Sequence, residues 1–156
     1  MKKGVLMLFL ILGCNITSTS PKKIEELNQT YAQSLSFPNK NFDIIVFKTY
    51  IYECGNMTEE ELNSYYNPDL LEEPFASQIK SFTDKKIIRE SEIKDYKDLK
   101  GSKVLYIAIE GKVENSKEVV VNENYEFNDG SKSEYFIINK HLILKNRTWK
   151  CIVEKK

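Results

Sequence analysis

Few residues of this chain combine the types and spacing that catalysis or ligand binding requires. His141 is the one histidine, and the pattern His141-Leu-Ile-Leu144 puts it on the strand face opposite Leu142 and Leu144. The sequence therefore predicts an exposed or hydrogen-bonded strand histidine. A serine triad would also need His141, but the chain has no Gly-x-Ser-x-Gly elbow, Gly-rich phosphate loop, His-Glu-x-x-His or Cys-x-x-Cys motif. We predict no catalytic, cofactor-binding or metal-binding residue, and no cofactor.

The three cysteines, Cys14, Cys54 and Cys151, point to different chemistry. Cys14 directly follows a short apolar run near the N-terminus. The other two form an even pair, so they are candidates for a disulfide in an oxidising compartment. The alternative is two buried thiols, each packed as a small apolar side chain.

The N-terminus has the three parts of an export signal. Lys2 and Lys3 precede an apolar run from Val5 to Leu12, and small Gly13 follows directly before Cys14. The run is too short for a helix that spans the membrane, which needs roughly 20 residues. It is therefore predicted to be a leader and not a mature transmembrane helix.

The quartet Ile11-Leu12-Gly13-Cys14 resembles the lipobox of bacterial lipoproteins. The resemblance implies a signal peptide at 1–13, cleavage before Cys14, and lipidation of the Cys14 sulfur with further acylation, as by palmitate, of the new amino group. Such an anchor would be stable, because two or more acyl chains suffice. The alternative is an ordinary secretory leader cut within Asn15–Ser20. Asn15 is not acidic, which favours the outer membrane if the host is Gram-negative.

Composition indicates one globular domain after the leader. The chain has 156 residues, 41% hydrophobic and 29% charged, with 23 basic and 23 acidic residues. Loss of 1–13 removes Lys2 and Lys3, which leaves 21 basic and 23 acidic residues and a net charge of −2. This balance gives no reason to expect a nucleic-acid partner. We expect a lipidated tether at 14–23, which contains Pro21 and small polar residues, and a single domain at 24–156.

Helices are predicted in the first half of that domain. Apolar residues recur at helical spacing before Phe37-Pro38 and again from Phe75, after Pro74. The stretch from Asn41 is ambiguous between strand and helix, and its apolar spacing, ending at Gly55, favours a helix. Thr58–Glu61 is a capping box that predicts a further helix through Tyr66. The supporting apolar positions are Ile24, Leu27, Tyr31 and Leu35; Ile44, Phe47, Ile51 and Cys54; and Phe75, Ile79 and Phe82.

Strands are predicted in the second half. Lys86–Ile93 is a candidate first strand, and apolar residues then alternate with polar ones along three further stretches. Asn128-Asp-Gly-Ser131 indicates a hairpin, since Asp-Gly tolerates the positive φ of primed turns. Ser133–Leu144 is its returning strand, and Asn146-Arg147 indicates another turn. The alternating residues are Leu105, Ile107, Ile109 and Val113; Val119, Val121, Tyr125 and Phe127; and Trp149, Cys151 and Val153.

This order predicts an α+β fold, with N-terminal helices packed on a curved antiparallel sheet of four to five strands. The chain resembles the NTF2-like (cystatin-fold-related) lipoprotein domains of bacteria. The resemblance rests on Phe47–Gly55, Thr58–Tyr66, the corner Tyr66–Leu70, the hairpin Tyr125–Lys132 and the closing Lys145–Lys150, which contains Trp149. It implies a cone-shaped sheet around a pocket. Arg147-Thr148 before the tryptophan and the long link Ser91–Lys103 depart from the family pattern.

The sequence favours a non-enzymatic, lipid-anchored binding domain in the cell envelope, with an envelope protein or a small apolar ligand as partner. Pocket or surface aromatics are densest at Tyr50, Tyr52, Tyr65 and Tyr66. One alternative is a hydrolase or isomerase in which a carboxylate such as Asp43 or Glu110 acts in the pocket. Another is an envelope inhibitor or immunity protein, for which a polar loop at Asn67–Pro74 or Ile93–Lys103 should project.

Overall fold

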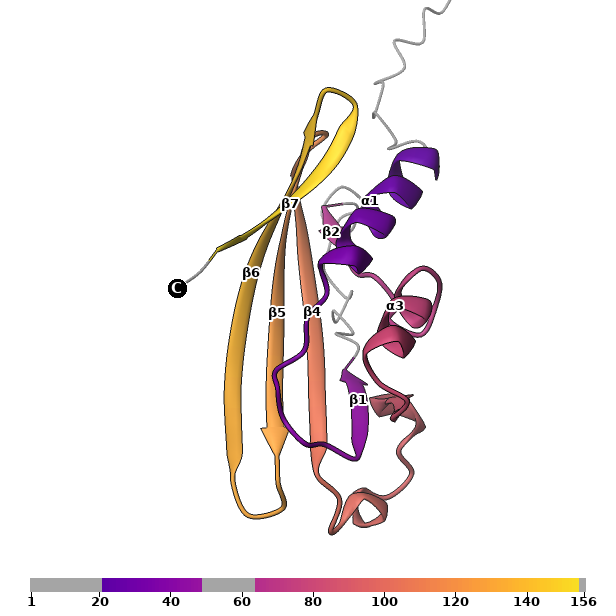
Figure 1. The fold of residues 1–156 in the computed structure, drawn as a ribbon, viewed down its shortest axis with the longest axis vertical. Helices are drawn as coiled ribbons and strands as arrows, with labels where there is room; N and C mark the ends of the chain where they lie inside the picture. Colours follow the sequence, from indigo (N-terminus) through magenta and orange to yellow (C-terminus); the bar gives the residue numbers. More distant parts are fainter. Residues whose placement is uncertain (1–20, 49–63, 155–156) are drawn as a thin grey trace, which may run out of the picture.

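The computed structural model describes residues 21–48 and 64–154. They form an α+β fold in which two α-helices pack on one face of a seven-stranded mixed sheet (Figure 1). The strand order is β3-β1-β4-β5-β6-β7, and β2 pairs with the far end of β4. The sequence predicted the class and the helices on one sheet face. The count of four to five strands is wrong, and so is the purely antiparallel pairing, because β1 runs parallel to its two neighbours.

Helix α1 spans Pro21–Ser34 and lies against β6 and β7 (Figure 1). Leu27 and Tyr31 are buried against the sheet, at the four-residue spacing that aligns side chains on one helix face. Proline suits the first turn of a helix, where its missing N–H costs nothing. Residues 21–23 of the predicted tether 14–23 are helical, and the rest of that tether lies outside the described residues.

Strand β1 spans Ile44–Lys48, where the sequence favoured a helix. That prediction is wrong for these residues, while residues 49–55 of the predicted helix lie outside the described part of the chain. β1 runs parallel to β3 on one side and to β4 on the other. Ile45, Val46 and Phe47 are all buried, because a parallel strand is covered on both faces and so lacks polar alternation. This absence of alternation made the stretch resemble a helix.

Tyr65–Tyr66 forms the short strand β2, paired antiparallel with Lys112 and Gly111. The predicted helix through Tyr66 is therefore wrong at its end, and its capping box Thr58–Glu61 lies outside the described residues. Gly111 is required by this pairing, since a Cβ there would lie 2.2 Å from the backbone oxygen of Tyr66. Helix α3, Phe75–Phe82, is confirmed, and it buries Phe75 and Ile79.

The second half of the chain is the predicted antiparallel meander. It consists of the long strands β4 (Val104–Asn115), β5 (Glu118–Asn128) and β6 (Ser133–Lys145), followed by β7 (Thr148–Glu154). Gly130 in the β5–β6 loop has φ +90°, and Asn146 and Arg147 have φ +51° and +66°, as a primed turn requires. Both predicted turns are confirmed.

The remaining elements lie between α3 and β4. β3 is shorter than predicted: it ends at Arg89, and 3-10 turns follow at Glu90–Glu92 and Tyr96–Leu99. The core lies between α1, α3 and the inner sheet face. Its members from the sheet include Leu105, Ile107, Val121, Leu142 and Trp149. Within residues 21–48 and 64–154, no helix is long and apolar enough to cross a membrane.

Candidate functional site: a buried charge pair and an open sheet edge

A charged pair lies inside the core, directly beneath the end of α1. Glu123 on β5 and Lys140 on β6 are both 0% exposed, and Lys140 Nζ lies 2.5 Å from Glu123 Oε1. The phenol of Tyr31 donates to Oε1 at 2.9 Å, and that of Tyr125 donates to Oε2 at 2.8 Å. Lys140 Nζ also donates to the carbonyl oxygen of Ser34 at 2.7 Å. Both carboxylate oxygens thus have donors.

The two phenols around Glu123 are held neutral. Burial raises the pKa of Tyr31 well above its ordinary value, and the negative charge of Glu123 raises it further. The same causes raise the pKa of Tyr125. Neutral phenols act here as donors to a carboxylate, and Lys140 places its positive charge at the C-terminal end of α1, where carbonyl groups carry partial negative charge. The cluster therefore stabilises the packing of α1 on the sheet. Its carboxylate and amine are bonded to each other and to neighbouring groups, so neither is free to bind a substrate.

Neither Glu123 nor Lys140 was among the predicted site residues, although the sequence contains a signal for both. Glu123 falls in the apolar series of one strand face, between Val121 and Tyr125. A charged residue in such a series is either a break in the face or a buried group with a partner. Lys140 occupies the equivalent face of β6, two residues before Leu142. Pairing the two anomalies would have found the cluster.

His141 lies on the opposite, outer face of the sheet. Its Nδ1 is 3.5 Å from Glu118 Oε1 and its Nε2 is 3.1 Å from Glu154 Oε1, with 29% of the side chain exposed. The structure thus places it as a strand histidine paired with carboxylates, as the sequence indicated. Because Glu123 is on the inner face, the buried carboxylate and the histidine do not converge on one cavity.

The two carboxylates considered for catalysis are also apart. Asp43 is exposed, and its Oδ2 accepts a hydrogen bond from the backbone N–H of Lys103 at 2.8 Å. This contact joins the chain just before β1 to the chain just before β4. Glu110 lies on β4 with Tyr106 and Ala108, on the face away from Leu105, Ile107 and Ile109. The structure therefore brings neither residue to His141 or to the buried pair.

Of the four predicted aromatics, the structure describes two. Tyr66 donates to Asn28 Oδ1 at 2.7 Å, and its ring meets Tyr31 edge to face at 6.1 Å. It is therefore a packing residue between β2 and α1, and its neighbour Tyr65 is half-buried on β2. Cys151 is half-buried on β7 against the core. Tyr50, Tyr52, Cys54 and Cys14 lie outside the described residues, so the Cys54–Cys151 disulfide stays a prediction.

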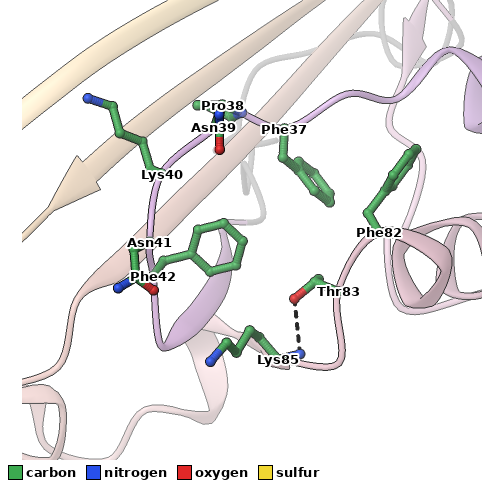
Figure 2. A pocket seen from close by; sticks show the side chains of 9 residues that line it. All are labelled: Phe37, Pro38, Asn39, Lys40, Asn41, Phe42, Phe82, Thr83 and Lys85. Carbon is green, nitrogen blue, oxygen red and sulfur yellow. Dashed lines mark hydrogen bonds between the residues drawn. The ribbon is translucent and has the colours of Figure 1, made fainter.

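A cavity of about 360 Å³ lies between the loop after α1 and the end of α3. Figure 2 shows the ring of Phe37 directed toward Phe82, while the amine of Lys40 points away from these two rings. Lys40 is paired with Glu134 at 2.6 Å. The lining contains no carboxylate, imidazole or thiol, and its polar groups are two lysines, two asparagines and a threonine beside the apolar rings. Its residues are Phe37, Pro38, Asn39, Lys40, Asn41, Phe42, Phe82, Thr83 and Lys85.

The two loops considered as projecting surfaces differ. Within Asn67–Pro74, Leu70 is fully buried, and Asp69 Oδ2 pairs with Arg89 at 2.6 Å, so this loop is packed onto the fold. Ile93–Lys103 lies at the end of the molecule beyond β3 and β4 (Figure 1). Most of its residues are exposed, including the ring of Tyr96. Only the second loop projects.

The two most exposed large apolar side chains of the described residues belong to one part of β6. Tyr135 is 71% exposed and Ile137 is 69% exposed. This part of β6 pairs with β5 on one side, whereas β7 begins to pair only at Asn139 on the other. Among the described residues, no strand covers Ser133–Ile138 on that second side. We name Ser133–Ile138 the open edge.

The described residues thus define a helix-covered mixed sheet with a buried charge pair and an open edge. Among them, no group of three or more His, Cys, Asp or Glu residues could hold a metal ion. No family model, curated protein or solved structure matches the chain.

Proposed function

We propose that this chain is a lipid-anchored protein of the cell envelope whose domain binds a protein or a small apolar ligand and catalyses no reaction. The proposed localisation is supported by the sequence, in which the short apolar run ends in Ile11-Leu12-Gly13-Cys14. Lipidation of Cys14 would hold the domain at a membrane surface, in the outer membrane if the host is Gram-negative. An anchor of two or more acyl chains gives lasting attachment.

The observation that carries the binding role is the exposure of Tyr135 and Ile137 on the open edge. Large apolar side chains beside unpaired backbone groups form a surface suited to a partner. The hydrolase or isomerase alternative lacks comparable support, since Glu123 is saturated by donors and His141 lies on the other sheet face.

We also propose that the domain is related to the NTF2-like fold. The meander β4–β7 with helices on one face supports it. The parallel group β3-β1-β4 has no counterpart in the antiparallel sheet that the resemblance implies.

The test uses the tagged full chain, expressed in bacterial cells that are fed an alkynyl palmitate and then solubilised in detergent. We expect the label on the wild-type chain and its loss in Cys14→Ala. We also expect a partner to co-purify with the wild type and to be lost in Ile137→Lys. Mass spectrometry identifies it as an apolar ligand or as an envelope protein, and a co-expressed untagged copy of this chain counts as such a protein. Ile24→Lys is the matched control, because Ile24 is an exposed isoleucine on α1 and its variant should retain the partner.

Two results would contradict the proposal. An unacylated product that starts beyond Cys14 would remove the anchor. Retention of the partner by Ile137→Lys would remove the binding surface. The inhibitor or immunity alternative has its own support in the exposed loop Ile93–Lys103, and it predicts that Tyr96→Lys, rather than Ile137→Lys, abolishes retention.

A further inference from the structure

Among residues 21–48 and 64–154, no strand pairs with the backbone groups of the open edge at three positions. At the two ends of the β5–β6 ladder, Asp129 N–H donates to the Lys132 oxygen and Leu144 N–H donates to the Lys117 oxygen. Antiparallel ladders alternate between residues that bond to the neighbour and residues that do not. Even-numbered residues of β6 therefore bond to β5. The N–H and C=O groups of Ser133, Tyr135 and Ile137 point outward.

The other sheet edges of the described residues are protected in ways that this one is not. β3 has four residues, of which Lys86 is exposed and Arg89 is paired with Asp69. β7 carries the charged, exposed Lys150 and Glu154. Short length and charge are the usual means of preventing edge pairing. The open edge contains no Pro or Gly, and its pairing with β5 has no bulge.

We infer that the open edge pairs with the open edge of a second copy of this chain, antiparallel and about a two-fold axis at Tyr135. This inference rests on the proposed function and names the partner of its binding surface. Tyr135 lies opposite Tyr135 of the copy, and Ser133 lies opposite Ile137. Each copy brings three N–H and three C=O groups, so the two edges exchange six hydrogen bonds. The two sheets become one continuous sheet.

The length of the edge fits a second copy. In the part of the chain that the structure describes, Asn139 is paired with Glu154, so an incoming strand can pair with β6 only up to Ile138. In the copy, β6 starts at Ser133, opposite Ile137, and the preceding loop leads back toward its own β5. The incoming chain therefore leaves the sheet before it reaches Asn139. A longer extended peptide would meet Glu154.

The charges of the open edge permit this pairing. Glu134 is the one charged residue in the segment, and on the inner face the two copies of Glu134 lie diagonally across the axis. Each is neutralised within its own chain by Lys40 at 2.6 Å and Lys132 at 3.1 Å. On the outer face, Tyr135 pairs with Tyr135, and Ile137 with Ser133. Aromatic cross-strand pairs of this kind stabilise sheets.

The test is disulfide trapping of the full chain in bacterial membranes under mild oxidation. In the inferred register, the two Tyr135 Cα atoms lie about 5.5 Å apart, within the range of a disulfide. Tyr135→Cys should therefore give a cross-linked dimer on a non-reducing gel. The wild-type chain, run beside it, accounts for Cys54 and Cys151.

Two further variants test the register. Ser133→Cys should not cross-link with itself, since the two Ser133 residues lie about 14 Å apart along the strands, but it should cross-link with co-expressed Ile137→Cys. Asn124→Cys, which sits on β5 beside Ile137, should not cross-link, because three strand spacings of ~4.8 Å separate the two copies. Equal cross-linking of Ser133→Cys and Tyr135→Cys, or no cross-linking of any pair, would overturn the inference.

The mass of the detergent-purified full chain provides an independent measurement. Light scattering should give a dimer for the wild type and for Ile24→Lys. Tyr135→Lys should give a monomer, because like charges directly opposite each other in a sheet are destabilising. A monomeric wild type would overturn the pairing with a second copy, while palmitate labelling and the partner lost in Ile137→Lys would still decide the proposed function.

Discussion

Lys140 and His141 are neighbours on β6, yet their side chains lie on opposite faces of the sheet in very different surroundings. Lys140 is 0% exposed and contacts Glu123 and Ser34 beneath α1. His141 is partly exposed between Glu118 and Glu154. Two consecutive residues therefore belong to a buried charge cluster and to a solvent-exposed one, because side chains alternate between the two faces of a sheet.

The comparison shows how burial determines the effect of a charge. Removing one member of a buried pair leaves the other charge without solvent or partner, which costs about 3–5 kcal/mol. An exposed pair is screened by water and contributes about 0–1 kcal/mol. We therefore expect substitutions on the two faces to differ several-fold in their effect on the free energy of unfolding.

The largest effect is expected for Lys140→Met. Methionine matches much of the lysine stem but leaves Glu123 buried with only the two phenols, so the free energy of unfolding should fall by about 3–5 kcal/mol. Urea unfolding followed by circular dichroism measures this change. Lys112→Met is the matched control, because Lys112 is exposed, and its effect should stay within about 0.5 kcal/mol.

The double variant Glu123→Gln/Lys140→Met distinguishes pairing from packing. If the two charges depend on each other, the double variant loses less stability than the sum of the two single variants, by about 1–3 kcal/mol. Strict additivity would mean that Glu123 and Lys140 act independently, and the account of the inner cluster would be wrong.

Ionisation of the buried phenols at alkaline pH should lower the free energy of unfolding by less, per residue, than Lys140→Met does. Burial raises the pKa of Tyr31, Tyr66 and Tyr125 above the ordinary value of about 10. The stability from this shift is fully present below pH ~10. As the pH rises further, the unfolded chain releases phenol protons that the folded chain keeps. The free energy of unfolding should then fall by about 1.4 kcal/mol per pH unit for each buried phenol.

Urea unfolding between pH ~9 and ~12 tests this prediction. Tyr125→Phe should make the fall shallower by about one phenol, or about 1.4 kcal/mol per pH unit. Tyr135→Phe is the matched control variant, because it also removes one phenol but lies outside the buried cluster, at an exposed ring. A wild-type chain whose stability stays constant over this range would contradict the neutral-phenol account.

The elements that could be predicted from the sequence are those in which one face meets the core and the other meets solvent. Leu27 and Tyr31 give α1 a helical period, and Val119 and Val121 give β5 a period of two. In a half-buried helix or strand, the spacing of apolar residues in the sequence matches the period of the element. The turns at Gly130 and Asn146-Arg147 were also predictable, because few residues tolerate a positive φ.

Three features could not be predicted in this way, each for a physical reason. β1 is buried on both faces, so Ile45, Val46 and Phe47 show no alternation. The pair Glu123–Lys140 is formed by two strands. Each charge interrupts an apolar strand face, but its partner can be named only once the register of β5 and β6 is known. The open edge depends on where β7 stops pairing, at Asn139, which is a matter of tertiary structure.

The smallest effect is expected for His141→Gln, on the outer face. Glutamine keeps a donor and an acceptor near Glu118 and Glu154, and the pairs it replaces are partly exposed, so the free energy of unfolding should change by less than about 1 kcal/mol. The same urea unfolding measures it beside Lys140→Met. The variant should also leave the Tyr135→Cys cross-link intact, since position 141 pairs with β7 through Ile152 and lies beyond the open edge. A loss near that of Lys140→Met would mean that the outer cluster is covered by another part of the chain or by a partner, and that the two faces are alike after all.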